Sequence, residues 1–280
     1  MSRTRTKWRP AQVAALPVLP QPIHMRAFTL QAGTRIAPHR HDWTQFLFAR
    51  TGTMQVTLES SAIILPPQFG LWIPEGNEHS VSSIEDSALE TLHIKTSALD
   101  NPPDIAKTVL VDEFVRIFIH YACTRIGSCY ETQNKAADRL HVLLGLLEEL
   151  PDAAMNLIIP RDPKLADLCY QMQTAPNRPF PLEECAAEAG MSPRTLLRRF
   201  VADTGLTYQA WRHRLRLMLA VEKLRGGESV TNVATDIGYS TTSSFTQAFQ
   251  REFGRSPTRF DTRSRQSRKS DNCQQFLSFQ

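Results

Sequence analysis

The sequence predicts an α+β fold, a β-barrel followed by an all-helical domain, and three features of the chain indicate it. Short apolar runs between residues 23 and 97 are separated by turn residues, which is typical of a small barrel or sandwich. A helical segment near the C-terminus occurs twice with the same internal spacing. A stretch without Pro or Gly joins the two copies. A chain of 280 residues is long enough for two domains, each with its own core.

Composition narrows the class of protein. With 41% hydrophobic residues the chain is globular, and its apolar runs are too short to cross a membrane. Residues 1–22 are expected to be a basic tail without the apolar stretch of a signal peptide, so we expect a soluble, cytoplasmic protein. The five cysteines lack paired spacing, which indicates reduced thiols and disfavours a zinc finger.

Residues 23–100 are expected to form the barrel. Breaks at turn residues such as Gly33, Gly52 and Gly76 divide this region. The expected strands are the runs IHMRAFTL, TQFLFAR, TMQVTLE, AIILP, FGLWIP, HSVSSI and ETLHI.

Histidines mark this region in a specific pattern. The spacing Gly33-x5-His39-x-His41-x3-Gln45-x6-Gly52, followed by Pro74-x-Gly76-x2-His79, resembles the two motifs of the cupin superfamily. In metal-bearing cupins the matching positions supply His, His, Glu and His, so the resemblance implies an effector pocket with His39, His41, Gln45 and His79. Residues two apart on one strand share a face, so His39 and His41 are expected to converge.

Two interpretations of the three histidines remain open. Gln45 stands where the anionic ligand would be, and a neutral amide is a poor ligand for most transition metals, so no cofactor is expected. As the alternative, His39, His41 and His79 hold a divalent metal such as Zn²⁺ or Ni²⁺. Further candidates for pocket lining are Arg26, Trp43, Phe48, Trp72 and His93.

Residues 101–160 are expected to hold helices for dimerisation and a linker. Phe114–Cys123 and Asn134–Leu150 have the pattern of amphipathic helices. A Leu-rich face on the second can pack on another copy of the chain or on its own barrel. Its residues are Ala136, Leu140, Leu143, Leu144 and Leu147. The proline-rich stretch Pro151–Pro163 is expected to be the linker.

The first repeat, Leu182–Tyr208, has the pattern of a helix-turn-helix unit. A short helix ends at Gly190, Ser192 is placed to cap the next helix and Pro193 fits its first position. Leu196 and Phe200, four residues apart, are expected to face the core. The outward residues, with Ser192, are expected to contact DNA: Arg194, Thr195, Arg198 and Arg199.

The connector Thr207–Arg225 is expected to be one helix that ends before Gly226-Gly227. Its expected apolar face comprises Tyr208, Trp211, Leu215, Met218, Leu219 and Leu224. A rigid connector of this length can hold two recognition helices one DNA turn apart, roughly 34 Å. We expect Arg216 to pair with Glu222 or Asp236 and so brace the two units.

The second repeat, Val230–Pro257, has the same layout, with Ser240 as the expected cap. Phe245, Phe249 and Phe253 recur every four residues and are expected in the core. The polar residues expected to contact DNA are Ser240, Thr241, Thr242, Ser243, Gln247, Gln250 and Arg251. Residues 262–280 are expected to be a basic, disordered tail.

The arrangement of repeat, connector and repeat over residues 161–261 resembles the DNA-binding domain of the AraC/XylS family of transcription regulators. The matching stretches are Ser192-Pro193-Arg194-Thr195-Leu196, Arg216-x3-Ala220 and Gly238-Tyr239-Ser240 through Ser256-Pro257. Asp261 departs from the pattern, because the family usually has Arg there. Charge agrees with this resemblance. Residues 161–280 hold 18 Lys and Arg against 12 Asp and Glu, and residues 1–160 hold 14 against 16.

The resemblance implies a regulator that binds double-stranded DNA and is controlled by a small-molecule effector in the barrel. It also implies a homodimer, a contact with RNA polymerase if the chain is an activator, no membrane partner and no enzymatic activity. Two other classes remain open: a metal-dependent cupin enzyme fused to a DNA-binding module, and a constitutive architectural DNA binder.

Overall fold

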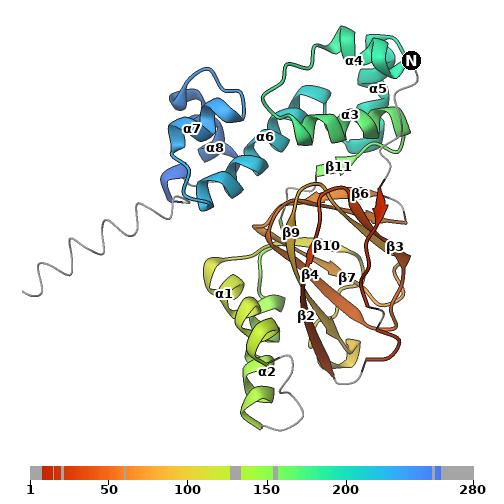
Figure 1. Ribbon diagram of the computed structural model, residues 1–280, viewed down its shortest axis with the longest axis vertical. Coiled ribbons are helices and arrows are strands. Elements are labelled where there is room, and N and C mark those ends of the chain that lie inside the picture. The colour runs from red at the N-terminus through yellow and green to blue at the C-terminus, as the bar shows by residue number, and fades with distance from the viewer. Residues whose placement is uncertain are drawn as a thin grey trace, which may run out of the picture. The chain divides into compact units, whose positions relative to one another are not determined.

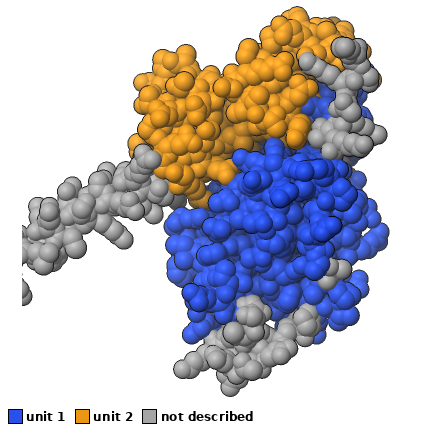
Figure 2. Space-filling view, in the orientation of Figure 1, with its two compact units in different colours: residues 1–167 blue, residues 168–280 orange. Residues whose placement is uncertain are grey.

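The computed structural model describes residues 8–14, 16–19, 22–59, 61–126, 134–153, 157–253 and 256–259. The chain divides into two compact units, residues 1–167 and residues 168–280, which Figure 2 shows in blue and orange. The expected tail at 262–280, and the expectations for Gly254 and Asp261, lie outside the described residues.

The first unit is built from two sheets (Figure 1). One sheet has the order β1-β3-β8-β5-β6-β11, with strands at Arg9–Pro10, Thr34–His39, His79–Ser83, Met54–Leu58, Ala62–Leu65 and Leu157–Ile159. The other has the order β10-β7-β4-β9-β2, with strands at Lys107–Leu110, Phe69–Ile73, Thr44–Thr51, Ser87–Ile94 and Ile23–Leu30. Neighbouring strands are antiparallel, except that β1 runs parallel to β3. The expected α+β fold with an N-terminal barrel is therefore confirmed.

Each of the seven expected runs forms a strand, and β7 and β8 are buried along their whole length. Four further strands lie outside these runs: the short edge strands β1, β10 and β11, and the interior strand β3. Of these, β11 lies inside the stretch expected to be the linker and pairs with β6 through Ile158 and Ile63. The tail expected at residues 1–22 likewise includes β1.

Two helices cover one face of the five-stranded sheet. They are α1 (Glu113–Tyr121), which continues into a π-helical turn at Ala122–Ile126, and α2 (Asn134–Glu148). Asp112 caps α1 by accepting from the Val115 amide at 2.8 Å. The Leu-rich face of α2 packs on the chain's own barrel. Leu140, Leu143, Leu144 and Leu147 are buried in one cluster with Phe46, Phe48, Trp72 and Leu92 of the sheet.

The second unit carries the two repeats as two helical pairs. The helix α3 (Pro163–Thr174) crosses the boundary between the units, and α4 (Leu182–Ala189) and α5 (Pro193–Thr204) form the first pair. The second pair is α7 (Val230–Asp236) and α8 (Thr242–Phe253), followed by a 3-10 turn at Pro257–Arg259. Gly190 and Gly238 occupy the matching turns at φ values of 66° and 81°, where a β-carbon is disfavoured.

The connector is a single helix, α6 (Tyr208–Arg225), and Thr207 caps it by accepting from the Ala210 amide. Phe200 packs against Tyr208 and Trp211 with ring centroids 5.6 and 5.7 Å apart, which fixes the first pair on α6. The apolar face of α6 differs from the expected one. Leu217, which was not expected there, is fully buried with the second pair, whereas Leu219, which was expected there, is only half-buried. Because α6 has a pair on each side, its apolar surface extends around more than one stripe.

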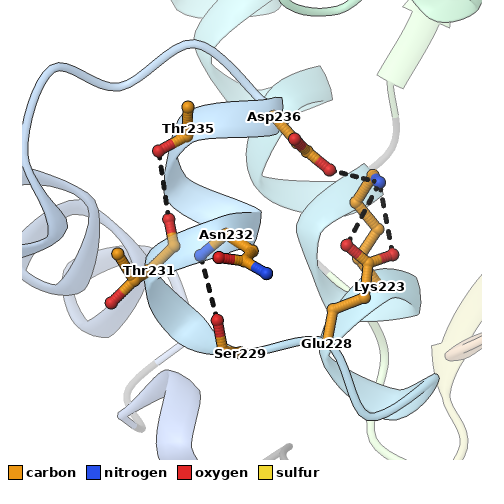
Figure 3. A network of polar contacts seen from close by, with 7 residues as sticks. All are labelled: Lys223, Glu228, Ser229, Thr231, Asn232, Thr235 and Asp236. Atoms are coloured by element: carbon orange, nitrogen blue, oxygen red, sulfur yellow. Dashed lines mark hydrogen bonds and ion pairs between the residues drawn. The ribbon is translucent and has the colours of Figure 1, made fainter.

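Polar contacts fix the junction of α6 and α7 (Figure 3). Lys223 pairs with Asp236 at 2.9 Å and with Glu228 at 3.3 Å, and Ser229 caps α7 through the Asn232 amide. The expected pairing of Arg216 with an acid is wrong. Its guanidinium donates to the Ile237 carbonyl and lies 4.5 Å from the Tyr239 ring centroid, because Asp236 is already bound by Lys223.

Candidate functional site: two DNA-reading helices and a histidine cluster

The helix α5 presents a basic face. Leu196 and Phe200 are buried, which leaves the other side of the helix in solvent. Arg194, Arg198 and Arg199 are exposed and Thr195 is half-buried. Arg194 and Arg198 make no hydrogen bond or ion pair within the described part of the chain, so both guanidinium groups are available to a partner.

Ser192 has a local role in this helix. Its hydroxyl accepts from the Thr195 amide at 3.2 Å and lies 2.9 Å from the Thr195 hydroxyl. This cap fixes the start of α5, where free amide groups favour a phosphate.

The helix α8 presents hydroxyl and amide groups. Phe245 and Phe249 are buried, Phe253 is half-buried and packs against Phe249, and the opposite face is polar. Thr242 is half-buried; the exposed residues are Ser240, Thr241, Ser243, Gln247, Gln250 and Arg251.

The expected cap of α8 is wrong by one residue. Thr241, not Ser240, accepts from the Ser244 amide at 3.1 Å. The second repeat has one more residue between the turn glycine and the helix, and that extra residue places Thr241 directly before the first helical turn.

Three histidines of the barrel converge. His39 ends β3 and His79 begins β8, and the two are paired in register. His41 lies beyond β3, which ends at His39, so the two do not share a strand as expected. The ring centroids nevertheless lie 4.8 Å apart for His39 and His41 and 4.3 Å apart for His39 and His79. One nitrogen from each ring lies within 4.8 Å of the others.

Hydrogen bonds select the tautomer of two of these rings. The Nδ1 atom of His39 lies 2.8 Å from the Ala37 carbonyl, and Nδ1 of His79 lies 3.1 Å from the Asn77 carbonyl. A carbonyl only accepts, so Nδ1 carries the proton and Nε2 keeps its lone pair. The Nε2 atoms of His41 and His79 are buried and have no partner among the described residues. Histidine ligands of metals are commonly oriented in this way.

A fourth histidine, His93 on β9, was predicted only as pocket lining. Its ring centroid lies 5.2 Å from that of His41, and its Nδ1 accepts from the Trp43 indole at 2.9 Å. Trp43 in turn stacks on His41 with an interplanar angle of 12°. Gln45 is the cross-strand neighbour of His93 and donates to Thr91 at 2.8 Å. Its Oε1 is buried and has no partner in the part of the chain that the structure describes. We refer to His39, His41, His79, His93 and Gln45 as the histidine cluster.

Two of the residues expected to line the pocket lie elsewhere. Phe48 and Trp72 belong to the hydrophobic cluster under α1 and α2, on the opposite face of the sheet from Gln45. Alternation along β4 accounts for Phe48, because residues three apart on a strand point to opposite faces.

Burial keeps His41, His79 and His93 neutral near pH 7. Burial, with His39 and His79 nearby, lowers the pKa of His41 to about 4, and burial with His39 lowers the pKa of His79 to about 4. Burial, His41 and Arg26 lower the pKa of His93 to about 3. Neutral imidazoles are the form that binds metals and accepts hydrogen bonds.

Comparison with known proteins identifies both domains. A helix-turn-helix domain model matches residues 185–263 and a cupin domain model matches residues 26–95. The HTH-type transcriptional regulator NimR of Escherichia coli is 31% identical over 85% of this chain and 87% of its own. The probable transcriptional regulator LumQ of Photobacterium leiognathi is 24% identical over 79% of this chain and 90% of its own.

Solved structures are more distant. ToxT from Vibrio cholerae matches 86% of this chain and 98% of its own at 9% identity, with a TM-score of 0.37. The part of the chain that the structure describes contains no helix long and apolar enough to span a membrane. On the strength of its resemblance to NimR and the two matching domains, the chain belongs to the AraC family of helix-turn-helix transcriptional regulators.

Proposed function

We propose that α5 and α8 read two half-sites on double-stranded DNA and that a small molecule bound at the histidine cluster controls this reading. The observation that carries the proposal is the presence, on one chain, of two capped helices with exposed polar faces and of a buried cluster of polar atoms that have no partner among the described residues. Effector binding would favour one of two states of the barrel and so change the affinity for DNA. Such a protein works in the cytoplasm.

The DNA-contacting residues proposed on α5 are Ser192, Arg194, Thr195, Arg198 and Arg199. On α8 and the residues before it they are Ser240, Thr241, Thr242, Ser243, Gln247, Gln250 and Arg251. Arg binds guanine or phosphate and Gln pairs with adenine, so the first helix supplies charge and the second supplies hydrogen bonds.

The test is binding of the purified chain to the DNA upstream of its own gene across a salt series. We expect sequence-specific binding whose log affinity falls linearly with log salt, because phosphate contacts release counterions. Scrambled DNA of the same length is the control. Equal, weak affinity for both DNAs would contradict the proposal.

A divalent metal fits the cluster in part. His39, His41 and His79 offer three imidazole nitrogens, and the backbone contacts of His39 and His79 orient the rings. Three imidazoles suit Zn²⁺ or Ni²⁺, and Gln45 does not supply a negative charge. When bound, such a metal would act as a Lewis acid toward a ligand.

Metal analysis and thermal unfolding of the chain with and without chelator test this. We expect His79→Ala to abolish any stoichiometric metal and its stabilisation, with His120→Ala as the control, since His120 lies at Glu90 outside the cluster. Substrate turnover that is lost with the metal would instead favour the cupin enzyme as the second candidate function.

A homodimer is the assembly that we propose. On α1 the side chains of Phe114, Ile117 and Tyr121 are 63, 58 and 41% exposed, and Val142 on α2 is 53% exposed. Residues three and four apart lie on one helix face, so α1 presents an apolar stripe. Sedimentation of Ile117→Lys against the unchanged chain tests it, and an unchanged mass would contradict it. If the regulator is an activator, RNA polymerase is a further partner.

A further inference from the structure

The histidine cluster contains a hydrogen-bond donor that no described residue uses. The Trp43 indole can only donate, so Nδ1 of His93, 2.9 Å away, must be the acceptor. In a neutral imidazole the proton then lies on Nε2. This Nε2 is buried and has no partner among the described residues, and His93 is 4% exposed. A buried donor without a partner is unfavourable, so a ligand that accepts from it would stabilise the barrel.

A cationic group shares the sheet face of His93. In the register of β2 and β9, His24 pairs with His93 and Arg26 pairs with Thr91, so Arg26 lies one rung from His93 on the same side. Arg26 is half-buried, and its charge contributes to lowering the pKa of both His41 and His93. Its guanidinium carbon lies 5.6 Å from the ring centroid of Phe28. Among the described residues, Arg26 has no ion pair or hydrogen bond.

Two acids close to His79 in the sequence are engaged outside the cluster. Glu78 pairs with Arg40 at 3.5 Å, and Glu75 accepts from Thr96 at 2.6 Å. Among the described residues, no carboxylate forms a hydrogen bond or ion pair with Arg26, His41, His79 or His93. The positive charge of Arg26 is therefore not balanced by direct contact with an acid of the described chain.

Gln45 keeps this imbalance in place. It occupies the cupin position of the acidic ligand, and it binds Thr91 through its amide nitrogen. A glutamate there would supply the missing charge from the protein. With glutamine, the charge has to come from the ligand.

We propose that the effector of this barrel is a small organic carboxylate, whose charge is bound by Arg26 and by the Nε2–H group of His93. This rests on the proposed function, in which the histidine cluster is the effector site. A carboxylate has acceptors only, which matches a guanidinium and an imidazole N–H, and charge-assisted hydrogen bonds of this type are the stronger ones. If a divalent metal is also bound, the same anion balances part of its charge.

The experiment is calorimetric titration of the full chain with acetate and benzoate, and with the uncharged counterparts acetamide and benzamide, with and without bound Zn²⁺. We expect at least one carboxylate to bind tenfold or more tightly than its amide. Arg26→Gln and His93→Phe should each weaken carboxylate binding at least tenfold. Arg40→Gln is the matched control, because it removes an exposed charge from the same barrel and should leave binding unchanged.

Gln45→Glu should change the affinities for carboxylate and for Zn²⁺ in opposite directions. It should weaken carboxylate binding at least tenfold and tighten Zn²⁺ binding, because the new carboxylate takes the place of the ligand's charge and adds an anionic metal ligand. A general disturbance of the barrel would weaken both. Circular dichroism verifies the fold of each variant, and Arg26→Gln, at a half-exposed position, keeps the test valid if His93→Phe does not fold.

The inference is overturned if the amides bind as tightly as the carboxylates, if no carboxylate binds, or if Arg26→Gln binds like the unchanged chain. Adding benzoate to the DNA-binding assay separates it from the proposed function. Carboxylate binding that leaves DNA affinity unchanged would support the anion site and contradict effector control. If only an uncharged molecule changed the affinity for DNA, effector control would be supported and the inference of a carboxylate effector would be overturned.

Discussion

The barrel has buried polar groups without a partner among the described residues, whereas the polar groups of the reading helices are exposed to solvent. In the barrel, Gln45, His79 and His93 each have a buried polar atom without a partner among the described residues. On the reading helices, the guanidinium groups of Arg194 and Arg198 are in solvent. A buried unpaired group costs about 1–3 kcal/mol, whereas an exposed one is hydrated at no such cost.

This difference indicates two kinds of recognition. In the proposed function a small molecule satisfies the buried atoms of the barrel, and its binding removes the cost of leaving them unpaired. DNA is too large to be enclosed, and the reading helices can present their polar groups in water until it arrives. Four predictions test this comparison, in order of decreasing effect.

The largest effect should come from the core beneath a reading helix. Phe200→Ala removes a fully buried ring and should lower the free energy of unfolding by about 3–5 kcal/mol. Leu197→Ala, at a 37% exposed position of the same helix, should change it by less than about 0.5 kcal/mol. Urea unfolding of both variants measures this. Similar losses would mean that the exposed face of α5 contributes to the core.

The next effect concerns pH and the barrel. The pKa of His79 is lowered from 6.5 to about 4, so between these values the unfolded chain binds protons that the folded chain does not. The contribution of His79 to the free energy of unfolding is therefore fully present above pH 6.5 and is lost as the pH falls toward 4. Urea unfolding of the chelator-treated chain at pH 7 and pH 5 measures the difference. It should shrink when His41, His79 and His93 are all replaced by Gln, and a constant difference would contradict the assignment.

A smaller effect is expected at the DNA interface. Arg198→Ala should weaken specific binding by about 1–3 kcal/mol and relax specificity at one base if the side chain reads guanine. If it binds phosphate, all sequences should lose affinity equally and the salt slope should become shallower. Binding to a set of singly substituted operators separates the two. Stability should not change in either case, because Arg198 is exposed.

The smallest effect distinguishes the two neighbouring hydroxyl residues before α8. Thr241→Ala removes the cap and should reduce stability by about 1 kcal/mol, whereas Ser240→Ala should leave it unchanged. Thermal unfolding measures both. A larger loss for Ser240→Ala would return the cap to the position expected from the alignment of the two repeats.

Much of the fold was predictable because local patterns and burial agree. The runs at β2 and β4 and the helix α6 form as predicted, since apolar residues recur in each at the period of its secondary structure. The edge strands β10 and β11 were missed because short strands carry no periodic signal, and their pairing with β7 and β6 depends on the rest of the barrel.

The candidate sites were predictable to different degrees. The outward residues of α5 and α8 follow from helical spacing, because each buried aromatic residue fixes which side of the helix is exposed. The histidine cluster was predicted from a motif, but the roles of His93 and Arg26 depend on strand register. Nothing near them in sequence indicates that β2, β4 and β9 bring them together.

The sequence by itself determined the two-domain order, the paired helical repeats and the three motif histidines, because each depends on spacing within a short segment. Tertiary structure alone decided that the Leu-rich face of α2 covers its own barrel, that Arg216 bonds the Ile237 carbonyl and that His93 accepts from Trp43. In each case several partners are chemically suitable, and the contact is made with the one that lies within reach. The distances between residues far apart in the sequence are set only when the chain folds, so the sequence pattern does not select among these partners.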